Sequence, residues 1–230
     1  MNQLNSVSEL LAIAEANPSD DYVGGWFYRG QSNWEWEPTP KAFRSPYVDG
    51  DDFEFKFKMW LKYSHNYPDM EYAHELEAMA IAQHHGFATK LLDWSSNILT
   101  AAFFACCDNF DCDARIIAYF PTQYIYLGDV ISPVDIKRTV GYQPKAVSKR
   151  LRSQSGYFTY HMEKSYIIEN EFFEAGNHHT LKQWFIPCEK KVEILKVLDR
   201  LSVNYKTLFP DLDGLSRHFC LQDEMRNANK

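Results

Sequence analysis

The sequence predicts an α+β fold in a single domain. Segments in which apolar residues recur at helical spacing dominate the first half, whereas segments rich in aromatic and β-branched residues dominate the second. Helices that are separated from strands along the chain are typical of α+β folds. The 230 residues are 45% hydrophobic, and neither a low-complexity linker nor an internal repeat divides them, so one large core is expected. We expect an N-terminal helical half around a Tyr-Arg-Gly strand, followed by a C-terminal half that mixes strands and helices.

The first elements are a short helix and the strand that carries Arg29. Residues 6–9 have the spacing of a capping box and predict a helix that ends at residues 17–18, Asn-Pro. Residues 26–31 (Trp-Phe-Tyr-Arg-Gly-Gln) predict a strand in which Arg29 lies on the face opposite Tyr28. We expect Arg29 at the end of this strand, just before a glycine turn, either facing a ligand or paired with an internal carboxylate such as Asp93.

Three helices are expected in the middle of the chain. Residues 33–46 contain several Trp and Pro residues and indicate an irregular loop. A helix begins at residue 51 or 52, although three alternating phenylalanines also permit a strand there. Residues 71–85 predict a helix capped by Gly86, and residues 97–107, which are apolar on nearly every face, predict a buried helix.

The second half is expected to supply most of the sheet and two more helices. The predicted strands are residues 115–120, 123–127, 157–160, 166–168 and 181–187. Residues 128–144 indicate a loop. Two helices are predicted to follow, at residues 189–201 and 212–220.

The joint between the two central helices is unusually polar. It contains Gln83, His84, His85 and Asp93, followed by Trp94. Buried polar groups must be hydrogen-bonded, so one interpretation is a bonded hinge that fixes the angle between two core helices. The other takes the carboxylate, the imidazoles, the Trp edge and the free amides of a helix N-terminus as a site for an anionic or aromatic ligand. Composition alone supports either interpretation.

The charge of the chain limits the nucleic-acid functions that it can have. A net charge of -7 and a pI near 5.6 argue against nucleic-acid binding that depends mainly on electrostatic attraction to the phosphates. One local exception is residues 137–152, which hold six positive charges. This segment is either a solvated face or a surface that receives a phosphate backbone.

Cysteine usage and hydropathy predict a cytoplasmic protein. The five cysteines form no disulfide framework, which suits a reducing compartment. Residues 1–4 lack the features of a secretory signal, and the longest apolar run, residues 98–107, is too short to span a bilayer. We therefore expect no membrane association, and we expect Cys106 and Cys107 to serve the core rather than chemistry.

Common catalytic motifs and metal sites are not indicated. Adjacent histidines point to different sides of a helix, so the His-His pairs do not converge on a metal, and none is expected. The sequence contains no Walker-type phosphate loop, no Gly-x-Ser-x-Gly and no His-Glu-x-x-His. This argues against the commonest NTPases, serine hydrolases and zinc proteases.

Several separated motifs together resemble the FRG domain family, which is named for its Phe/Tyr-Arg-Gly element. They occupy residues 26–31, 83–94, 102–105, 152–159, 181–187 and 208–215. The resemblance extends from about residue 22 to about residue 219. We expect an N-terminal helix in residues 1–21, an FRG-like domain in residues 22–220 and a polar tail in residues 221–230.

The Tyr-Arg-Gly element also resembles the first strand of arginine-type ADP-ribosyltransferases, and this second resemblance implies an ADP-ribosyltransferase-like fold. In those enzymes the strand arginine holds NAD and a glutamate on a later strand contacts the nicotinamide ribose. The resemblance gives Arg29 the first role and, among three glutamates after the Gln154 motif, gives Glu163 the second ahead of Glu169 and Glu171. No typical Gln-x-Glu or Glu-x-Glu context surrounds them. The residues expected to contact NAD are Tyr28, Arg29, Gln31, Gln83, Thr89, Trp94 and Gln154.

FRG proteins occur among bacterial toxin and phage-defence genes, so the resemblance implies a toxin that uses NAD to modify a nucleic acid, with RNA as the expected acceptor. An antitoxin or chaperone is an expected partner. The expected catalytic residues are Arg29, Glu163, His84 and Asp93. One alternative is a noncatalytic module that binds a nucleotide or a partner. Another is a nuclease or glycohydrolase in which Asp93 and His84 act as acid and base.

Overall fold

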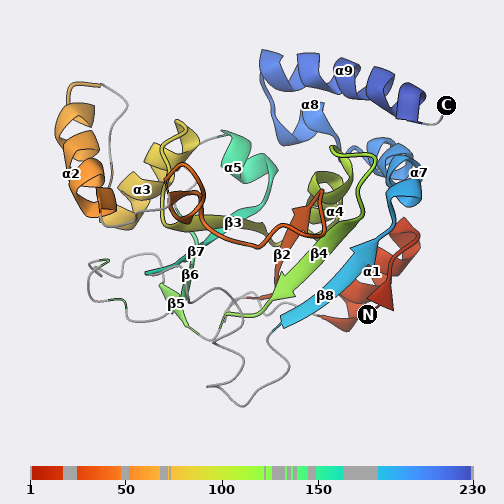
Figure 1. Cartoon of the computed structure of the whole chain (residues 1–230), viewed down its shortest axis with the longest axis horizontal. Helices are drawn as coiled ribbons and strands as arrows, with labels where there is room; N and C mark the ends of the chain where they lie inside the picture. Colours follow the sequence, from red (N-terminus) through yellow and green to blue (C-terminus); the bar gives the residue numbers. More distant parts are fainter. Residues whose placement is uncertain are drawn as a thin grey trace.

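A mixed β-sheet runs through the centre of the molecule, with helices gathered at both of its ends (Figure 1). The computed structural model describes residues 2–17, 25–47, 52–67, 72, 74–121, 123–125, 133, 136, 139–144, 149–162 and 181–228. Within these residues the strand order is β1-β8-β4-β2-β3-β7-β6-β5. The pairs β1–β8 and β5–β6 are parallel, and the other neighbouring pairs are antiparallel.

The strands are β1 (Asn2–Gln3), β2 (Phe27–Gln31), β3 (Leu91–Ser95), β4 (Ala114–Tyr119), β5 (Tyr124–Ile125), β6 (Val140–Tyr142), β7 (Gly156–Tyr160) and β8 (Leu181–Ile186). The helices are α1 (Val7–Ala16), η1 (Lys41–Phe43), α2 (Phe53–Ser64), α3 (Glu75–His84), α4 (Ile98–Cys106), α5 (Lys149–Ser153), α7 (Cys188–Arg200), α8 (Tyr205–Leu208) and α9 (Leu212–Ala228). In Figure 1, α2 and α3 lie at one end of the molecule and α1 and α7 at the other.

The helices bury two separate cores against the sheet. One core joins α1, α4 and α7 to the face of the sheet that carries Tyr28. The second lies beneath α2 and α3 and includes Leu91 of β3 and Phe158 of β7. A smaller aromatic cluster, to which Phe27 and Trp94 belong, occupies the other side of β2, β3 and β4. The predicted alternation of Phe27 and Tyr28 is therefore confirmed.

Gly30 lets helix α4 lie directly on strand β2. A Cβ at this position would lie 1.8 Å from the carbonyl oxygen of Ala101 and 2.6 Å from the backbone nitrogen of Ala105. Only a residue without a side chain permits this approach of two backbones. The expected glycine turn after Arg29 is thus wrong, because the strand continues through Gly30 to Gln31.

The α+β class and most predicted elements are confirmed. Helix α1 begins after Ser6, whose Oγ accepts from the Glu9 backbone nitrogen, and α2 excludes the alternative strand at residues 53–57. Gly86 has a φ of 89°, as expected for a residue that ends a helix. Residues 166–168, which were expected to form a strand, lie outside the described residues.

Four predicted boundaries need correction. The helix expected at residues 71–85 is α3, which begins at Glu75 after a cap by His74. The joint before α4 contains strand β3, because Leu92 and Trp94 alternate with Asp93 and pair with β7. The expected loop at residues 128–144 includes β6. Helix α9 continues through the buried Leu221 to Ala228, into the expected polar tail.

None of the described helices combines the length and the apolar composition needed to cross a lipid bilayer.

Candidate functional site

A cleft of about 1240 Å³ opens beside strands β2 and β3. Helices α3, α4, α5 and α8 and the loop that follows β2 contribute to its walls. Residues that the sequence singled out line it together, although they come from distant segments: Tyr28, Arg29, Gln31, Gln83, His84, Asp93, Trp94 and Gln154. Thr89 is not part of the lining but is connected to it by a hydrogen bond to Gln83.

The cleft follows a divergence between two neighbouring strands. β2 and β3 pair only at Tyr28 and Ser95, whereas β2 pairs with β4 along its whole length. The edge of β3 before Ser95 is not paired with β2 and therefore leaves backbone groups for side chains to bond. Arg29 uses this edge, because its Nη1 donates to the carbonyl oxygen of Asp93 at 2.6 Å.

Arg29 is a half-buried cation without a carboxylate partner in the described part of the chain. The ion pairs found there do not include it, so the expected alternative of an Arg29–Asp93 salt bridge is not what the structure has. Its Nε is buried and lacks a hydrogen-bond partner among the described residues. Burial lowers the pKa of Arg29 to about 10, although the nearby Asp93 opposes this shift. The guanidinium therefore has unused capacity to donate hydrogen bonds.

Asp93 is held by a chain of polar side chains from α3 and the following loop. Gln83 Nε2 donates to Asp93 Oδ1 at 2.7 Å, and Thr89 Oγ1 donates to Gln83 Oε1. Thr89 Oγ1 also accepts from the backbone nitrogen of Leu91 at 3.1 Å. Gln83 and Thr89 thus form the bonded hinge of the first interpretation, and the hinge fixes an exposed carboxylate in the cleft. The ligand site of the second interpretation stays a prediction.

Trp94 does not provide the stacking surface that the sequence suggested. Its side chain is 4% exposed, and its ring packs against Tyr119 with 5.6 Å between centroids. Its indole nitrogen donates to Thr159 Oγ1 at 2.8 Å. Strand alternation places it on the face opposite Asp93, since Trp94 belongs to the aromatic cluster with Phe27. Only the backbone of Trp94 remains available to a ligand.

Gln31 and Gln154 both use their amides to hold the walls. Gln31 Oε1 accepts from Arg115 Nε at 2.9 Å, and its Nε2 donates to the Glu37 carbonyl at 3.4 Å. Gln154 Nε2 donates to the Leu208 carbonyl at 3.1 Å, which ties the end of α5 to α8. These bonds indicate that both glutamines shape the cleft.

Part of the chain that forms this site matches a known protein family. Residues 24–114 match the family model of the FRG domain. The chain carries an FRG domain. No curated protein and no solved structure matches the chain.

The FRG domain supplies only part of the cleft. Arg29, Gln83 and Asp93 lie inside the matched residues, whereas Arg150 and Phe209 lie beyond them. Phe209, Phe104 and Tyr205 form an aromatic wall in which the ring centroids are 5.3 to 6.0 Å apart. The cleft is therefore completed by α5 and α8, after the FRG domain ends.

Sequence reasoning missed two arginines that line this cleft. Arg44 follows η1 in the Pro-rich loop of the FRG domain, and Arg150 belongs to α5. Arg150 was noticed only as one charge in the basic segment, and Arg44 carried no sequence signal beyond its neighbouring prolines. Their convergence depends on how the loop and α5 pack, which spacing along the chain does not reveal.

His84 lies at the rim of the cleft, apart from Asp93. Burial lowers its pKa, and His85 and Arg150 lower it further, whereas Asp211 raises it. None of the hydrogen bonds in the described part of the chain joins His84 to Asp93, whose Oδ1 is bonded to Gln83. The acid and base pair expected for a nuclease or glycohydrolase is thus not preassembled.

Some predicted residues lie outside the described part of the chain. These are Glu163, Glu169 and Glu171, together with Lys137, Arg138 and Lys145 of the basic segment. Of that segment, Lys149, Arg150 and Arg152 are described, and all three are exposed on α5.

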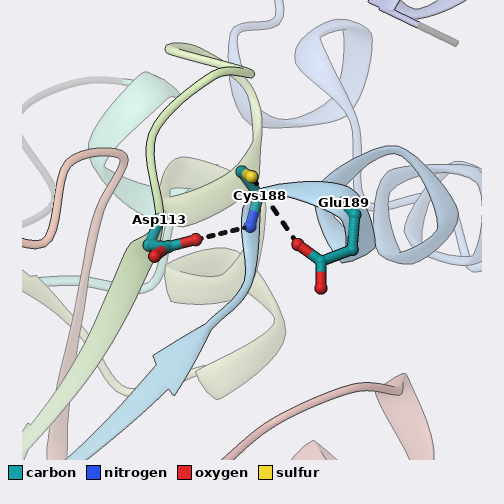
Figure 2. Close-up of side chains that lie close together, drawn as sticks. All are labelled: Asp113, Cys188 and Glu189. Carbon is teal, nitrogen blue, oxygen red and sulfur yellow. Dashed lines mark hydrogen bonds between the residues drawn. The ribbon is translucent and has the colours of Figure 1, made fainter.

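One group of potential metal ligands lies away from the cleft. Figure 2 shows Asp113, Cys188 and Glu189, whose ligand atoms lie within 4.8 Å of one another. Asp113 Oδ1 accepts from the backbone nitrogen of Cys188 at 2.9 Å and so caps α7, whose N-cap residue Pro187 offers no side-chain cap. Burial and the hydrogen bond to Glu189 raise the pKa of the Cys188 thiol. A capping role accounts for this group, because a metal would require the thiolate.

Proposed function

We propose that the cleft binds NAD as a co-substrate and that the protein transfers ADP-ribose from it to a nucleic acid. The observation that carries the proposal is the presence of Arg29, Arg44 and Arg150 in one cleft, with no carboxylate ion pair to any of them among the described residues. Guanidinium groups with free donors are suited to phosphate oxygens, which they bind through two parallel hydrogen bonds.

The size and lining of the cleft fit a dinucleotide. Pockets for drug-sized ligands are roughly 300 to 1,000 Å³, and this cleft is somewhat larger, at about 1240 Å³. The buried Nε of Arg29 lacks a partner among the described residues, and an oxygen of the ligand would satisfy it. The aromatic wall of Phe104, Tyr205 and Phe209 offers an apolar surface for a planar ring.

The proposed reaction breaks the bond between C1′ of the ribose and the nicotinamide nitrogen. Nicotinamide leaves as a neutral molecule with the electron pair of that bond, and an oxygen or nitrogen of the acceptor bonds to C1′. Positive charge develops at C1′, so a carboxylate near it would stabilise the transition state. Asp93 and Glu163 are the candidates for this role. The acceptor loses a proton, which His84 could take because its lowered pKa keeps the imidazole neutral near pH 7.

A nucleic-acid acceptor is supported by the cations of α5, of which Arg150 lines the cleft, and by the toxin resemblance. Helix α5 exposes Lys149, Arg150 and Arg152 to solvent, although the net charge of the whole chain is -7. Phosphate contacts from such side chains position a nucleic acid without reading its sequence. We propose that RNA is the acceptor, that the activity serves as a toxin in phage defence or a toxin-antitoxin system, and that an antitoxin or chaperone restrains it.

The test is transfer of label from NAD. Purified protein is incubated with NAD labelled in the adenylate and with total RNA, and RNA-bound label is measured together with released nicotinamide. Arg29→Ala should abolish both signals and keep the circular dichroism spectrum, and Arg29→Lys should restore little because the planar fork is lost. Arg226→Ala, which removes an exposed surface arginine, is the matched control. Normal transfer by a folded Arg29→Ala protein would contradict the proposal.

The second candidate is a noncatalytic module that binds a nucleotide. One observation favours it. The side-chain amides of Gln31, Gln83 and Gln154 are all hydrogen-bonded to other residues of the protein, which suits a rigid recognition site. Binding of NAD without release of nicotinamide, in the presence of RNA or lysate, would identify this candidate.

A further inference from the structure

We propose that Arg44 and Arg150 form an anion-binding subsite next to Arg29 in the cleft, and that it takes a phosphate group. Arg44 comes from the loop after η1 and Arg150 from α5, so the subsite is built by segments that are far apart in the sequence. The inference rests on the proposed function, since it deepens the role of the same cleft.

Arg44 is anchored at one nitrogen and leaves its other donors unused. Its Nε donates to the carbonyl of Thr39 at 2.6 Å, within a loop that the Ala42 nitrogen ties to the Thr89 carbonyl. The described residues provide no further hydrogen bond and no ion pair to the guanidinium of Arg44. A guanidinium fixed through Nε presents its two terminal nitrogens as a fork that matches two oxygens of a phosphate.

Arg150 is held by stacking, which also leaves its donors free. Its guanidinium carbon lies 3.9 Å from the centroid of the Phe209 ring, and the bonds and ion pairs of the described chain do not use its nitrogens. Stacking on a ring fixes the plane of the guanidinium while its edges stay available. The Phe209 ring packs against the rings of Phe104 and Tyr205, and these contacts fix the orientation of the ring on which Arg150 stacks.

One carboxylate is shared by the guanidinium groups of the cleft. Both arginines of the subsite are influenced by Asp93, which is also the acidic neighbour of Arg29. Asp211 and Asp213 are further acidic neighbours of Arg150. Arg29 and Arg44 thus share one carboxylate. A phosphate beside them would supply further negative charge, in a chain whose overall charge of -7 would otherwise repel anions.

The phosphate has two possible sources, which share one chemistry. It can belong to the pyrophosphate of a dinucleotide in the cleft, or to the backbone of the nucleic acid that enters beside α5. ADP-ribose carries the first without the reactive nicotinamide bond, and a ten-nucleotide oligoribonucleotide carries the second. Adenosine carries neither and serves as an uncharged probe.

The experiment measures the affinity of the full chain for these three probes by calorimetry. We expect Arg44→Gln and Arg150→Gln each to weaken binding of ADP-ribose, the oligonucleotide or both by about tenfold or more, the usual effect of losing a charge-assisted hydrogen bond. Arg226→Gln, which removes an exposed arginine of α9 outside the cleft lining, is the matched control and should change each affinity less than twofold. Adenosine affinity and melting temperature should stay unchanged in all variants.

The affinities for ADP-ribose and for the oligonucleotide together identify the source of the phosphate. Weakened ADP-ribose binding assigns the subsite to the dinucleotide, and weakened oligonucleotide binding alone assigns it to the acceptor. Unchanged affinities for both anions in folded Arg44→Gln and Arg150→Gln proteins would overturn the inference, as would an equal loss in Arg226→Gln. None of these measurements requires turnover. A protein that binds through this subsite but never releases nicotinamide would refute the transferase proposal and leave the subsite in place.

Discussion

Replacing Gly30 with Ala should destabilise the protein severely, because the added methyl group would meet backbone atoms of α4. The new Cβ would lie 1.8 Å from the Ala101 carbonyl oxygen, whereas ordinary contact begins at 3.4 Å, so the helix and strand would have to separate by about 1.6 Å. Neither backbone can rotate away as a side chain could. Overpacking of a core typically costs about 1–3 kcal/mol, and we expect about 3 kcal/mol or more here, since α4 is buried on nearly every side.

The assay is urea unfolding followed by circular dichroism, with ADP-ribose affinity measured in parallel. Gly86→Ala is the matched control: nothing lies within 4 Å of its added Cβ, so only the positive φ of 89° opposes the change, at about 1 kcal/mol. Because Ala101 and Phe104 of α4 line the cleft, any folded Gly30→Ala protein should also bind ADP-ribose more weakly. An unfolding midpoint equal to that of the wild type would refute this account of Gly30.

Three further predictions address separate features. Affinity for ADP-ribose should rise as the pH falls from 7 to 5, because a bound phosphate favours protonation of His84, whose pKa lies below its ordinary 6.5 in the free protein; His84→Gln should flatten this profile, and an equal rise in that variant would contradict the role. Lys191→Met should lower the free energy of unfolding by about 2–4 kcal/mol, measured in urea, because the buried ammonium donates to three backbone carbonyls that would lose their partner; an unchanged midpoint would show that the bonds contribute nothing. Cys106 and Cys107 should resist alkylation at pH 8 until the protein unfolds, since burial raises both thiol pKa values, that of Cys107 to about 11; rapid modification of the native protein, seen by mass spectrometry, would contradict this.

Local pattern was sufficient to find most of the secondary structure. Helix α7 and strand β8 were predicted to within a residue or two, because each has a clear apolar period and a boundary marked by Pro187. The β3 strand was missed because it is only five residues long and lies between two helix signals. Asp93 and Ser95 in that strand are of residue types that commonly cap helices, whereas the cap of α4 is Asn97, whose Oδ1 accepts from the Leu99 nitrogen at 2.9 Å.

The composition of the site was partly predictable, but its geometry was not. Arg29, Gln83 and Asp93 were selected from sequence and lie in one cleft. The expected anion site at the N-terminus of α4 is not part of that cleft, whose lining from α4 begins at Ala101. Positive charge comes instead from arginines on other elements, and such convergence depends on tertiary packing that no local period encodes.

The cleft depends on segments that follow the FRG domain, and this limits what the domain can do alone. Strand β3, which carries Asp93, pairs with β7 over its full length and with β2 at one position only. Residues 24–114 therefore contain the two strands that flank the cleft but lack the strand that holds β3 in the sheet. They also lack α5, which supplies Arg150, and α8, which supplies Tyr205 and is followed directly by Phe209. It follows that the binding we propose requires the longer chain, in which β7 pairs with the strand that carries Asp93 and α5 and α8 complete the cleft.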